Sequence, residues 1–314
     1  MHTNKNKIRY HLLLFLKGSL MGLADLIPGV SGGTIAFISG IYEELIESIA
    51  SININAIKVL RSEGPFKFWS LINGNFLLTL VCGVLFSVIL FSRLVYFLLI
   101  EEKILVSAFF FGLILASSIY ILRDLTSLRY KEILGVISGF AVVLLVSMTP
   151  IVSVTDSFFV LFFGGSLAIC AMILPGISGS LILLLLGIYP IVLGAIGQFQ
   201  WNILLIFGLG CIFGLLVFSR ILIVLLKAYR PIITSILTGF LFGSLAIVWP
   251  WRYPIDFNLS QNDVKFFSPY QLFFPDEFLL ITEQSPQTFT VISLMVIGFL
   301  AVFAVGFISK KITR

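Results

Sequence analysis

Charged residues are scarce in this sequence. Asp, Glu, Lys and Arg make up 11% of the 314 residues, whereas an ordinary soluble domain contains about 25%. Hydrophobic residues make up 59%. A soluble fold of this composition would leave large apolar surfaces in contact with water, so the composition excludes a soluble globular protein. It favours a polytopic membrane protein with no sizeable soluble domain.

Histidine and cysteine are also scarce. The two histidines, His2 and His11, both lie near the N-terminus. The three cysteines, Cys82, Cys170 and Cys211, lie within apolar segments and form no CxxC motif, which disfavours metal and disulfide chemistry. Membrane lipid phosphatases use a histidine or a carboxylate–metal cluster, and the few acids here show no ligand spacing. We therefore predict no metal site, no cofactor and no enzymatic activity.

Long apolar runs are abundant. A membrane helix needs about 17–25 apolar residues, and six runs approach or exceed this length. We predict transmembrane helices at residues 76–99, 104–122, 133–152, 203–226, 231–249 and 288–308. Two further apolar stretches are interrupted, one by PGVSGG at residues 28–33 and the other by PGISGS at residues 175–180.

The two interrupted stretches belong to an internal repeat. At an offset of 147 residues, the Gly-Ser-Leu, Pro-Gly-x-Ser-Gly and Gly-Ile-Tyr segments that begin at 18, 28 and 40 match segments that begin at 165, 175 and 187. Further along, the offset falls to 127, and the Phe-Ser-Arg segment at 91–93 matches the one at 218–220. Several matches in the same order indicate a duplication, with halves at residues 1–152 and 153–314.

The predicted fold is an all-α polytopic membrane protein with an inverted-topology repeat. Each half has one re-entrant, broken-helix hairpin, at residues 12–49 or 157–197, followed by three transmembrane helices. Residues 250–287 form an outer loop. This arrangement puts most Lys and Arg residues on one face, which the positive-inside rule assigns to the cytoplasm together with both termini. Three crossings per half invert the second half relative to the first, as in many secondary transporters.

We predict that the two breaks bind an anion. Pro28 and Pro175 disfavour a continuous helix, and the glycines beside them permit non-helical backbone. Such backbone at membrane depth is tolerated only where it is buried in protein or lines a wet cavity, and a helix that starts there presents free N–H groups to a phosphate. The candidate phosphate-binding residues are Gly29, Ser31, Gly32 and Gly33 in the first half and Gly176, Ser178, Gly179 and Ser180 in the second. The alternative is that these glycines only allow close helix packing.

Two arginines occupy matching positions of the repeat within apolar spans. Arg93 and Arg220 each lie at a depth of about 9 Å from the end of a span, where a charged side chain is by default a functional residue. A guanidinium group suits phosphate oxygens, so we predict that both pair with the anion. The alternative is that each side chain snorkels to the nearest headgroups.

The acidic residues break the symmetry. Asp25, Glu43 and Glu44 flank the first break, where the second half has Met172, Pro190 and Ile191. A carboxylate near membrane depth can carry a coupling proton or pair with an arginine, and we predict a coupling or gating role for Asp25 and Glu43. The alternative for Glu43, and the interpretation we favour for Glu44, is an ordinary charge at the membrane interface.

Three segments resemble a known family. They are KGSLMGLADLIPGVSGGTIAFISGIYEELI at residues 17–46, ILPGISGSLILLLLGIYP at residues 173–190 and GSLAIVWPW at residues 243–251. Together they resemble the bacterial polyprenyl-phosphate transporters, a family formerly classed as a domain of unknown function, over essentially the whole chain. The resemblance implies recycling of undecaprenyl phosphate, the lipid carrier of cell-envelope synthesis, from the outer to the inner leaflet of the bacterial cytoplasmic membrane. It implies a polyprenyl phosphate and membrane lipids as partners, and no nucleic acid.

Without the resemblance, the residues indicate an inverted-repeat transporter of an anion, with proton or sodium coupling left open. With the resemblance, we expect the two glycine-rich loops to pass the phosphate headgroup between the faces by alternating access. An ion-coupled transporter or channel for a small anion would use the same hairpin sites. It would differ in having an enclosed aqueous route in place of a lateral opening to lipid, and the sequence alone does not separate the two. The oligomeric state is not indicated, nor is whether the hairpins re-enter or cross the membrane twice.

Overall fold

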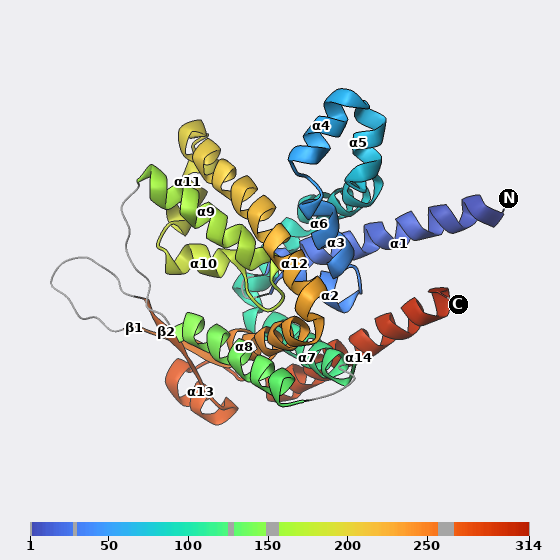
Figure 1. Cartoon of the computed structure of the whole chain (residues 1–314). Helices are drawn as coiled ribbons and strands as arrows, with labels where there is room; N and C mark the ends of the chain where they lie inside the picture. The colour runs from blue at the N-terminus through green and yellow to red at the C-terminus, as the bar shows by residue number, and fades with distance from the viewer. Residues whose placement is uncertain (1, 28–29, 125–128, 149–156, 257–266, 314) are drawn as a thin grey trace.

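The computed structural model describes residues 2–27, 30–124, 129–148, 157–256 and 267–313, which are mostly helical (Figure 1). The first half contains α1 (His2–Asp25), α2 (Gly32–Ile38), α3 (Tyr42–Ala50), α4 (Ile54–Ser62), α5 (Pro65–Leu71), α6 (Gly74–Glu101), α7 (Lys103–Asp124) and α8 (Tyr130–Met148). The second contains α9 (Phe158–Ile173), α10 (Gly179–Leu185), α11 (Tyr189–Gly197), α12 (Trp201–Ile247), the antiparallel strands β1 (Arg252–Asp256) and β2 (Phe267–Leu272), α13 (Pro275–Thr282) and α14 (Thr288–Thr313).

The described residues include four helices that are long and apolar enough to cross a membrane, namely α6, α7, α8 and α12. The number rises to five if α10 and α11, which meet at 108°, form one bent span. This confirms the prediction of a multi-pass helical membrane protein. Helices α6 to α8 coincide with the first three predicted spans, except that residues 149–152 lie outside the described residues.

Helix α12 is too long for a single crossing. Its 47 residues would extend about 70 Å as one straight helix, more than twice the roughly 30 Å of a bilayer core. Its backbone leaves the helical conformation at Tyr229 (φ −135°, ψ 40°), two residues before Pro231, which has no N–H to donate. The break lies between the predicted spans 203–226 and 231–249, which are the two arms of this helix. The sixth predicted span falls in α14, whose apolar part is Thr288–Phe303.

Glycines allow close packing where α1 lies along α6 and where α9 lies along the first arm of α12. At each crossing, a methyl group on the glycine would overlap with a backbone carbonyl of the facing helix. Such close approach is typical of helix pairs in membranes. The contacts occur at matching positions of the two halves: Gly18 with Leu80 and Gly83 with Phe15, then Gly165 with Phe207 and Gly210 with Phe162.

A second set of glycine contacts joins one half to the other. Helix α7 packs on α14, and α8 packs on the second arm of α12. Here too the contacts occur in matching pairs: Gly112 with Met295 and Gly298 with Phe109, then Gly239 with Val136 and Gly139 with Ile236. Each of these two helix pairs therefore consists of one helix from the first half and one from the second.

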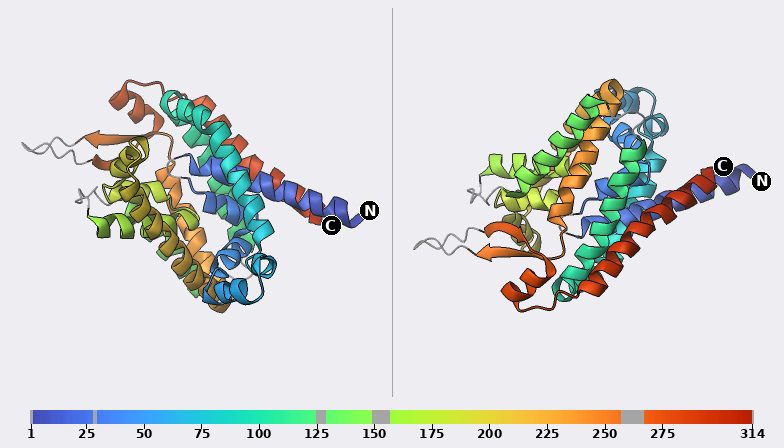
Figure 2. Two further views of the ribbon diagram at one scale, coloured as in Figure 1. Left: turned by 90° about the horizontal axis from the view of Figure 1, so that it is seen from above. Right: turned by 90° about the horizontal axis from the view of Figure 1, so that it is seen from below.

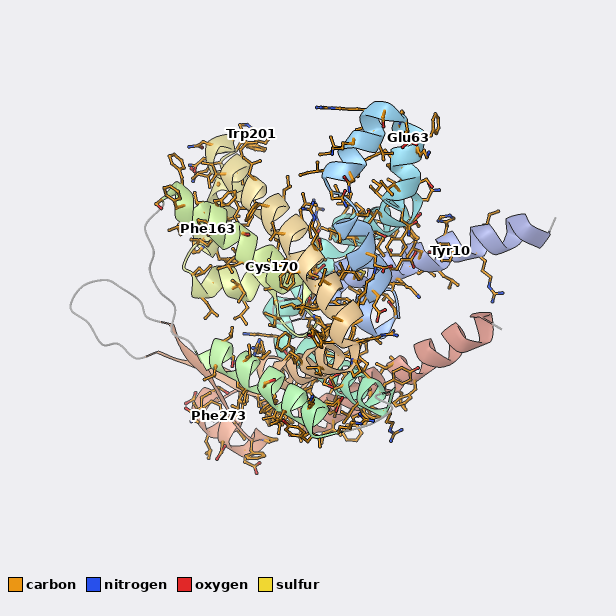
Figure 3. The ribbon with its side chains drawn as sticks, in the orientation of Figure 1. Tyr10, Glu63, Phe163, Cys170, Trp201 and Phe273 are labelled. Carbon is orange, nitrogen blue, oxygen red and sulfur yellow. The ribbon has the colours of Figure 1, made fainter. Side chains whose placement is uncertain are left out.

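The chain ends lie on the same side of the molecule, opposite the β1–β2 strands (Figure 1). Both further views keep the N- and C-termini together (Figure 2). The short helices α4 and α5 lie at the opposite end of the molecule from α13, as the labelled Glu63 and Phe273 also show (Figure 3). The largest buried apolar cluster contains Ile27, Val30, Ile35, Ile173 and Ile177, so the core surrounds the two helix breaks.

Candidate functional site

The two helix breaks contact each other, although they are far apart in the sequence. The Ser31 hydroxyl donates to the Met172 carbonyl oxygen at 2.7 Å, and the Gly176 N–H donates to the Thr34 hydroxyl oxygen at 2.9 Å. Ser31, Thr34 and Gly176 are buried. A methyl group on Gly33 would overlap with the carbonyl of Ile173. The glycine and the two hydroxyls therefore let the breaks meet at the backbone level.

The amino end of α2 is occupied by groups of the protein itself. The Gly32 N–H donates to the Asp25 carboxylate at 2.7 Å, and the Gly33 N–H donates to the Ser31 hydroxyl at 3.1 Å. A carboxylate is stabilised at the positive end of a helix, where it satisfies an otherwise unpaired donor. In this structure Asp25 thus holds the position at which an external anion was predicted to bind. Pro28 and Gly29 lie outside the described residues.

The amino end of α10 differs from that of α2. Met172 stands where the first half has Asp25, and within the described residues no side chain caps the first N–H groups of α10. The Ser178 and Ser180 hydroxyls lie 2.8 Å apart beside these groups. Gly176 has a φ of 86°, a backbone conformation that favours glycine. The predicted residues of the second half therefore lie together, with hydroxyl and N–H donors at one helix end.

The two arginines have different surroundings. An Arg220 Nη2–H donates to the Ile52 carbonyl oxygen at 2.8 Å, while the buried Nε of Arg220 has no hydrogen-bond partner among the described residues. Arg93 is exposed on α6. At equivalent positions of the repeat, Arg220 is thus hydrogen-bonded to the protein, whereas Arg93 is exposed.

Two ion pairs join α3 to α12 near its break. Glu43 pairs with Arg230 and Glu47 pairs with Lys227, each at 2.8 Å, and all four side chains are about half exposed or more. Helix α3 packs along α12, whereas α11 makes no comparable contact with α6 within the described part of the chain. At the 147-residue offset the two glutamates correspond to Pro190 and Gly194. The ion pairs therefore belong to the first hairpin alone.

Glu44 lies among polar groups outside this contact. Its carboxylate accepts hydrogen bonds from the Tyr10 hydroxyl at 3.3 Å and from the Asn73 amide at 3.0 Å. Burial, together with the charge of Glu44, raises the pKa of Tyr10 to about 12, so the hydroxyl stays a donor. This environment fits the interpretation of Glu44 as a charge near the membrane interface.

Three residues of this region were not predicted from the sequence. Thr34 has no polar counterpart in the second half, so the repeat gave no signal for it. Lys17 donates to the Ser39 carbonyl oxygen at 2.7 Å, and its place in an apolar segment could have revealed it by the argument used for the arginines. Tyr42 is buried with its hydroxyl unpaired among the described residues, and it belongs to the repeated Gly-Ile-Tyr segment.

Known proteins match this chain over most of its length. Residues 21–265 fit the family described as undecaprenyl phosphate translocase-like. The chain belongs to this family. A polyprenyl-phosphate transporter from Vibrio cholerae is 41% identical over 289 residues, which cover 92% of this chain and 94% of the relative. One from Staphylococcus aureus is 34% identical over 253 residues, covering 75% of this chain and 85% of the relative. No solved structure matches.

Membership of the translocase-like family confirms the resemblance inferred from the three sequence segments. The matched region includes both helix breaks and both arginines.

Proposed function

We propose that this protein carries undecaprenyl phosphate, or a related polyprenyl phosphate, from the outer to the inner leaflet of the bacterial cytoplasmic membrane. The family and the two relatives named polyprenyl-phosphate transporters support the substrate class. The observation that carries the mechanism is the contact between two buried helix breaks, which brings uncapped donors to the centre of an apolar protein. The isoprenoid tail would stay in lipid while the phosphate follows this polar path.

In this proposal the halves are inverted repeats with re-entrant hairpins and cytoplasmic termini. The matching glycine contacts, and the position of both termini opposite the β1–β2 strands, support this arrangement. The phosphate binds at the amino end of α10, to Gly176, Ser178, Gly179 and Ser180. It binds at Ser31, Gly32 and Gly33 when the Asp25 carboxylate gives up the Gly32 N–H, because two anions would repel each other there. Arg93 and Arg220 pair with the phosphate as it enters and leaves, and the carrier is not an enzyme.

The α3–α12 ion pairs close the cytoplasmic side in this proposal. Arg220 is then held by Ile52 on the closed side, while the exposed Arg93 faces the open outer side. Opening towards the cytoplasm requires α3 to leave α12 and the Glu43–Arg230 and Glu47–Lys227 pairs to break. Glu43 thereby has the gating role predicted for it.

The transport assay uses purified protein in proteoliposomes with a fluorescent polyprenyl phosphate in one leaflet. We expect the wild-type protein to move the headgroup across, and an Arg93→Gln/Arg220→Gln variant to be at least tenfold slower because each step loses a charge-assisted contact. Arg129→Gln, which removes an exposed arginine outside the predicted spans, is the matched control and should transport normally.

The same vesicles test the small-anion alternative. Uptake of inorganic phosphate or another small anion by the wild type, without lipid translocation under proton or sodium gradients, would contradict the lipid-carrier proposal.

Reversing the charges of the α3–α12 ion pairs should open the cytoplasmic side. Exposed ion pairs contribute about 0.2–1 kcal/mol each, so loss of both should raise the open population roughly two- to thirtyfold. The measurement is thiol labelling of Ser48→Cys, which replaces a buried serine on α3, in a protein whose three native cysteines are changed to alanine. Labelling should accelerate in Glu43→Lys/Glu47→Lys.

The complementary reversal provides the control. Adding Lys227→Glu and Arg230→Glu should restore slow labelling, because the pairs re-form with opposite polarity. An equal labelling rate in the wild-type and the Glu43→Lys/Glu47→Lys backgrounds would refute the gate. So would a fourfold variant that labels as fast as the double variant.

A further inference from the structure

The α4–α5 hairpin, residues 53–73, is an insertion in the first half. Helices α3 and α11 match end to end at the 147-residue offset, and α6 and the start of α12 match at the 127-residue offset. Residues 51–73 connect α3 to α6 in the first half, whereas residues 198–200 alone connect α11 to α12 in the second half. The fall in offset equals the difference in length between these two connections, and the short connection shows that the repeat does not need the hairpin for chain continuity.

The α4–α5 hairpin exposes a large apolar surface. Phe66 is 92% exposed and Ile54 is 70% exposed, whereas Ala56 and Ile72 are buried. The other exposed apolar residues are Ile57, Leu60, Trp69 and Leu71. Helices of nine and seven residues extend only about 14 and 10 Å, so neither can cross the roughly 30 Å hydrocarbon core. Neither helix therefore spans the membrane, and their exposed apolar residues are available to a partner at this end of the molecule.

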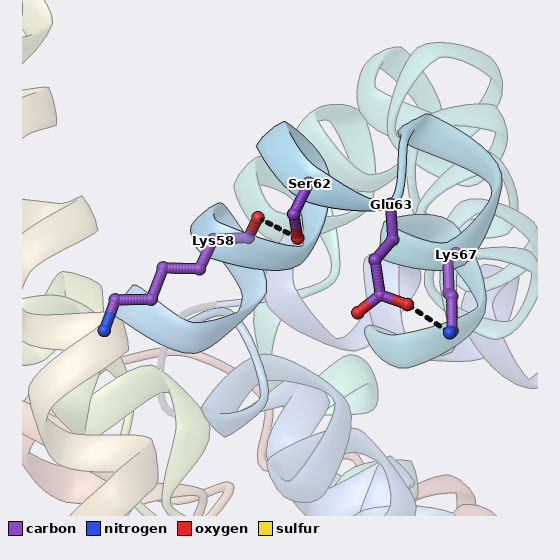
Figure 4. Close-up of polar contacts among 4 residues, drawn as sticks. All are labelled: Lys58, Ser62, Glu63 and Lys67. Carbon is purple, nitrogen blue, oxygen red and sulfur yellow. Dashed lines mark hydrogen bonds and ion pairs between the residues drawn. The ribbon is translucent and has the colours of Figure 1, made fainter.

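Cations flank the apolar surface. Lys58, Arg61 and Lys67 are exposed, and the single acid of the hairpin, Glu63, pairs with Lys67 (Figure 4). The Lys58 backbone carbonyl accepts from the Ser62 hydroxyl, while the Lys58 side chain extends away from the helix (Figure 4). A helix with an apolar face and flanking Lys and Arg lies in a membrane interface, with its cations at anionic headgroups.

Helix α13 provides a contrast at the opposite end of the molecule. Its Leu279, Leu280 and Ile281 are also exposed, but its charged residues are the acids Asp276 and Glu277. Both helical elements can lie at a membrane surface through apolar contacts, but only the α4–α5 hairpin carries a net positive charge. The charge pattern therefore favours an anionic lipid surface over a second protein as the partner of the α4–α5 hairpin.

We infer that the α4–α5 hairpin docks on the anionic phospholipid headgroups of the leaflet at its own end of the molecule, with Phe66 and Ile54 in the interface. The hairpin directly follows Ile52, whose carbonyl accepts from Arg220. Docking would therefore anchor the end of the first broken-helix hairpin to that leaflet. This inference does not depend on which anion the protein transports.

The test places an environment-sensitive fluorophore on Phe66→Cys, in the full chain with the native cysteines changed to alanine. The protein is reconstituted in vesicles of phosphatidylcholine, with or without phosphatidylglycerol, and nitroxide lipids and aqueous iodide serve as quenchers. We expect strong quenching by nitroxide lipids only when phosphatidylglycerol is present. An anionic surface attracts each cation by about fivefold, so Lys58→Gln/Arg61→Gln should weaken this preference roughly 25-fold.

Two comparisons sharpen the result. Glu63→Gln should strengthen the preference for phosphatidylglycerol by releasing Lys67, and a label at Leu280→Cys on α13 should show no such preference. Iodide quenching at position 66 in every vesicle would overturn the inference. So would protection that appears only in native membranes, since that outcome would indicate a protein partner.

Discussion

Replacing Gly33 with valine should reduce transport at least tenfold, whereas replacing Gly194 with valine should leave it close to the wild-type rate. Even the Cβ atom of a side chain at Gly33 would overlap with the Ile173 carbonyl. This carbonyl is part of the backbone at the other break, so relieving the overlap would require a backbone shift. Overpacking of this kind destabilises by about 1–3 kcal/mol or more. At Gly194 the same atom would have no neighbour within 4 Å.

The measurement for this pair is translocation in proteoliposomes together with the melting temperature in detergent. Because Gly33→Val could fail to fold, Ser31→Ala provides a milder variant of the same contact. It leaves the Met172 carbonyl without its donor, which costs about 1–3 kcal/mol, and it should slow transport while the protein remains monodisperse. Wild-type transport by both Gly33→Val and Ser31→Ala would show that contact between the breaks is not required.

Asp25→Asn should keep the fold but lose the response of transport to an imposed proton gradient. An asparagine oxygen can still accept from the Gly32 N–H, so the geometry at the start of α2 is retained while the titratable charge is removed. Asp25→Ala leaves this buried donor unpaired and should be both less stable and at least tenfold slower. The comparison separates the role of the charge from the role of the hydrogen bond.

The assay for Asp25 follows headgroup movement with and without a pH difference across the vesicle membrane. Glu44→Gln is the matched control, because its partners Tyr10 and Asn73 lie away from the breaks, and its rate should stay within about twofold of wild type. An Asp25→Asn protein that responds to the gradient as the wild type does would remove Asp25 from the coupling mechanism.

The sequence predicts the helices well because their causes are local. Apolar length predicts α6, α7 and α8, and the helix-breaking residues around 28–33 and 175–180 correctly separate α1 from α2 and α9 from α10. Pro231 likewise marks the break of α12. The α4–α5 hairpin was not predicted as a feature, although the change of repeat offset located its insertion. Its helices of nine and seven residues lack the long apolar run that identifies a span.

The predicted site is only partly a matter of sequence. Two breaks with Pro, Gly and Ser can be recognised from their spacing, and so can the intramembrane position of Arg93 and Arg220. Their partners cannot, because a hydrogen bond between Ser31 and Met172 depends on how two distant segments pack. The occupation of the Gly32 N–H by Asp25 has the same origin, since the turn between them decides whether the carboxylate reaches the helix end.

By itself, the sequence determined that this is a multi-pass helical protein with two broken helices, and its motifs identified the family. It also predicted an internal duplication. These properties follow from hydropathy, from the backbone limits of proline and glycine, and from the order of residues. Only the tertiary structure decided that the breaks touch, that α3 is paired with α12 by charge, and that Arg220 is engaged while Arg93 is exposed. Equivalent positions of a repeat obey the same local rules, so only packing between distant segments can make them differ.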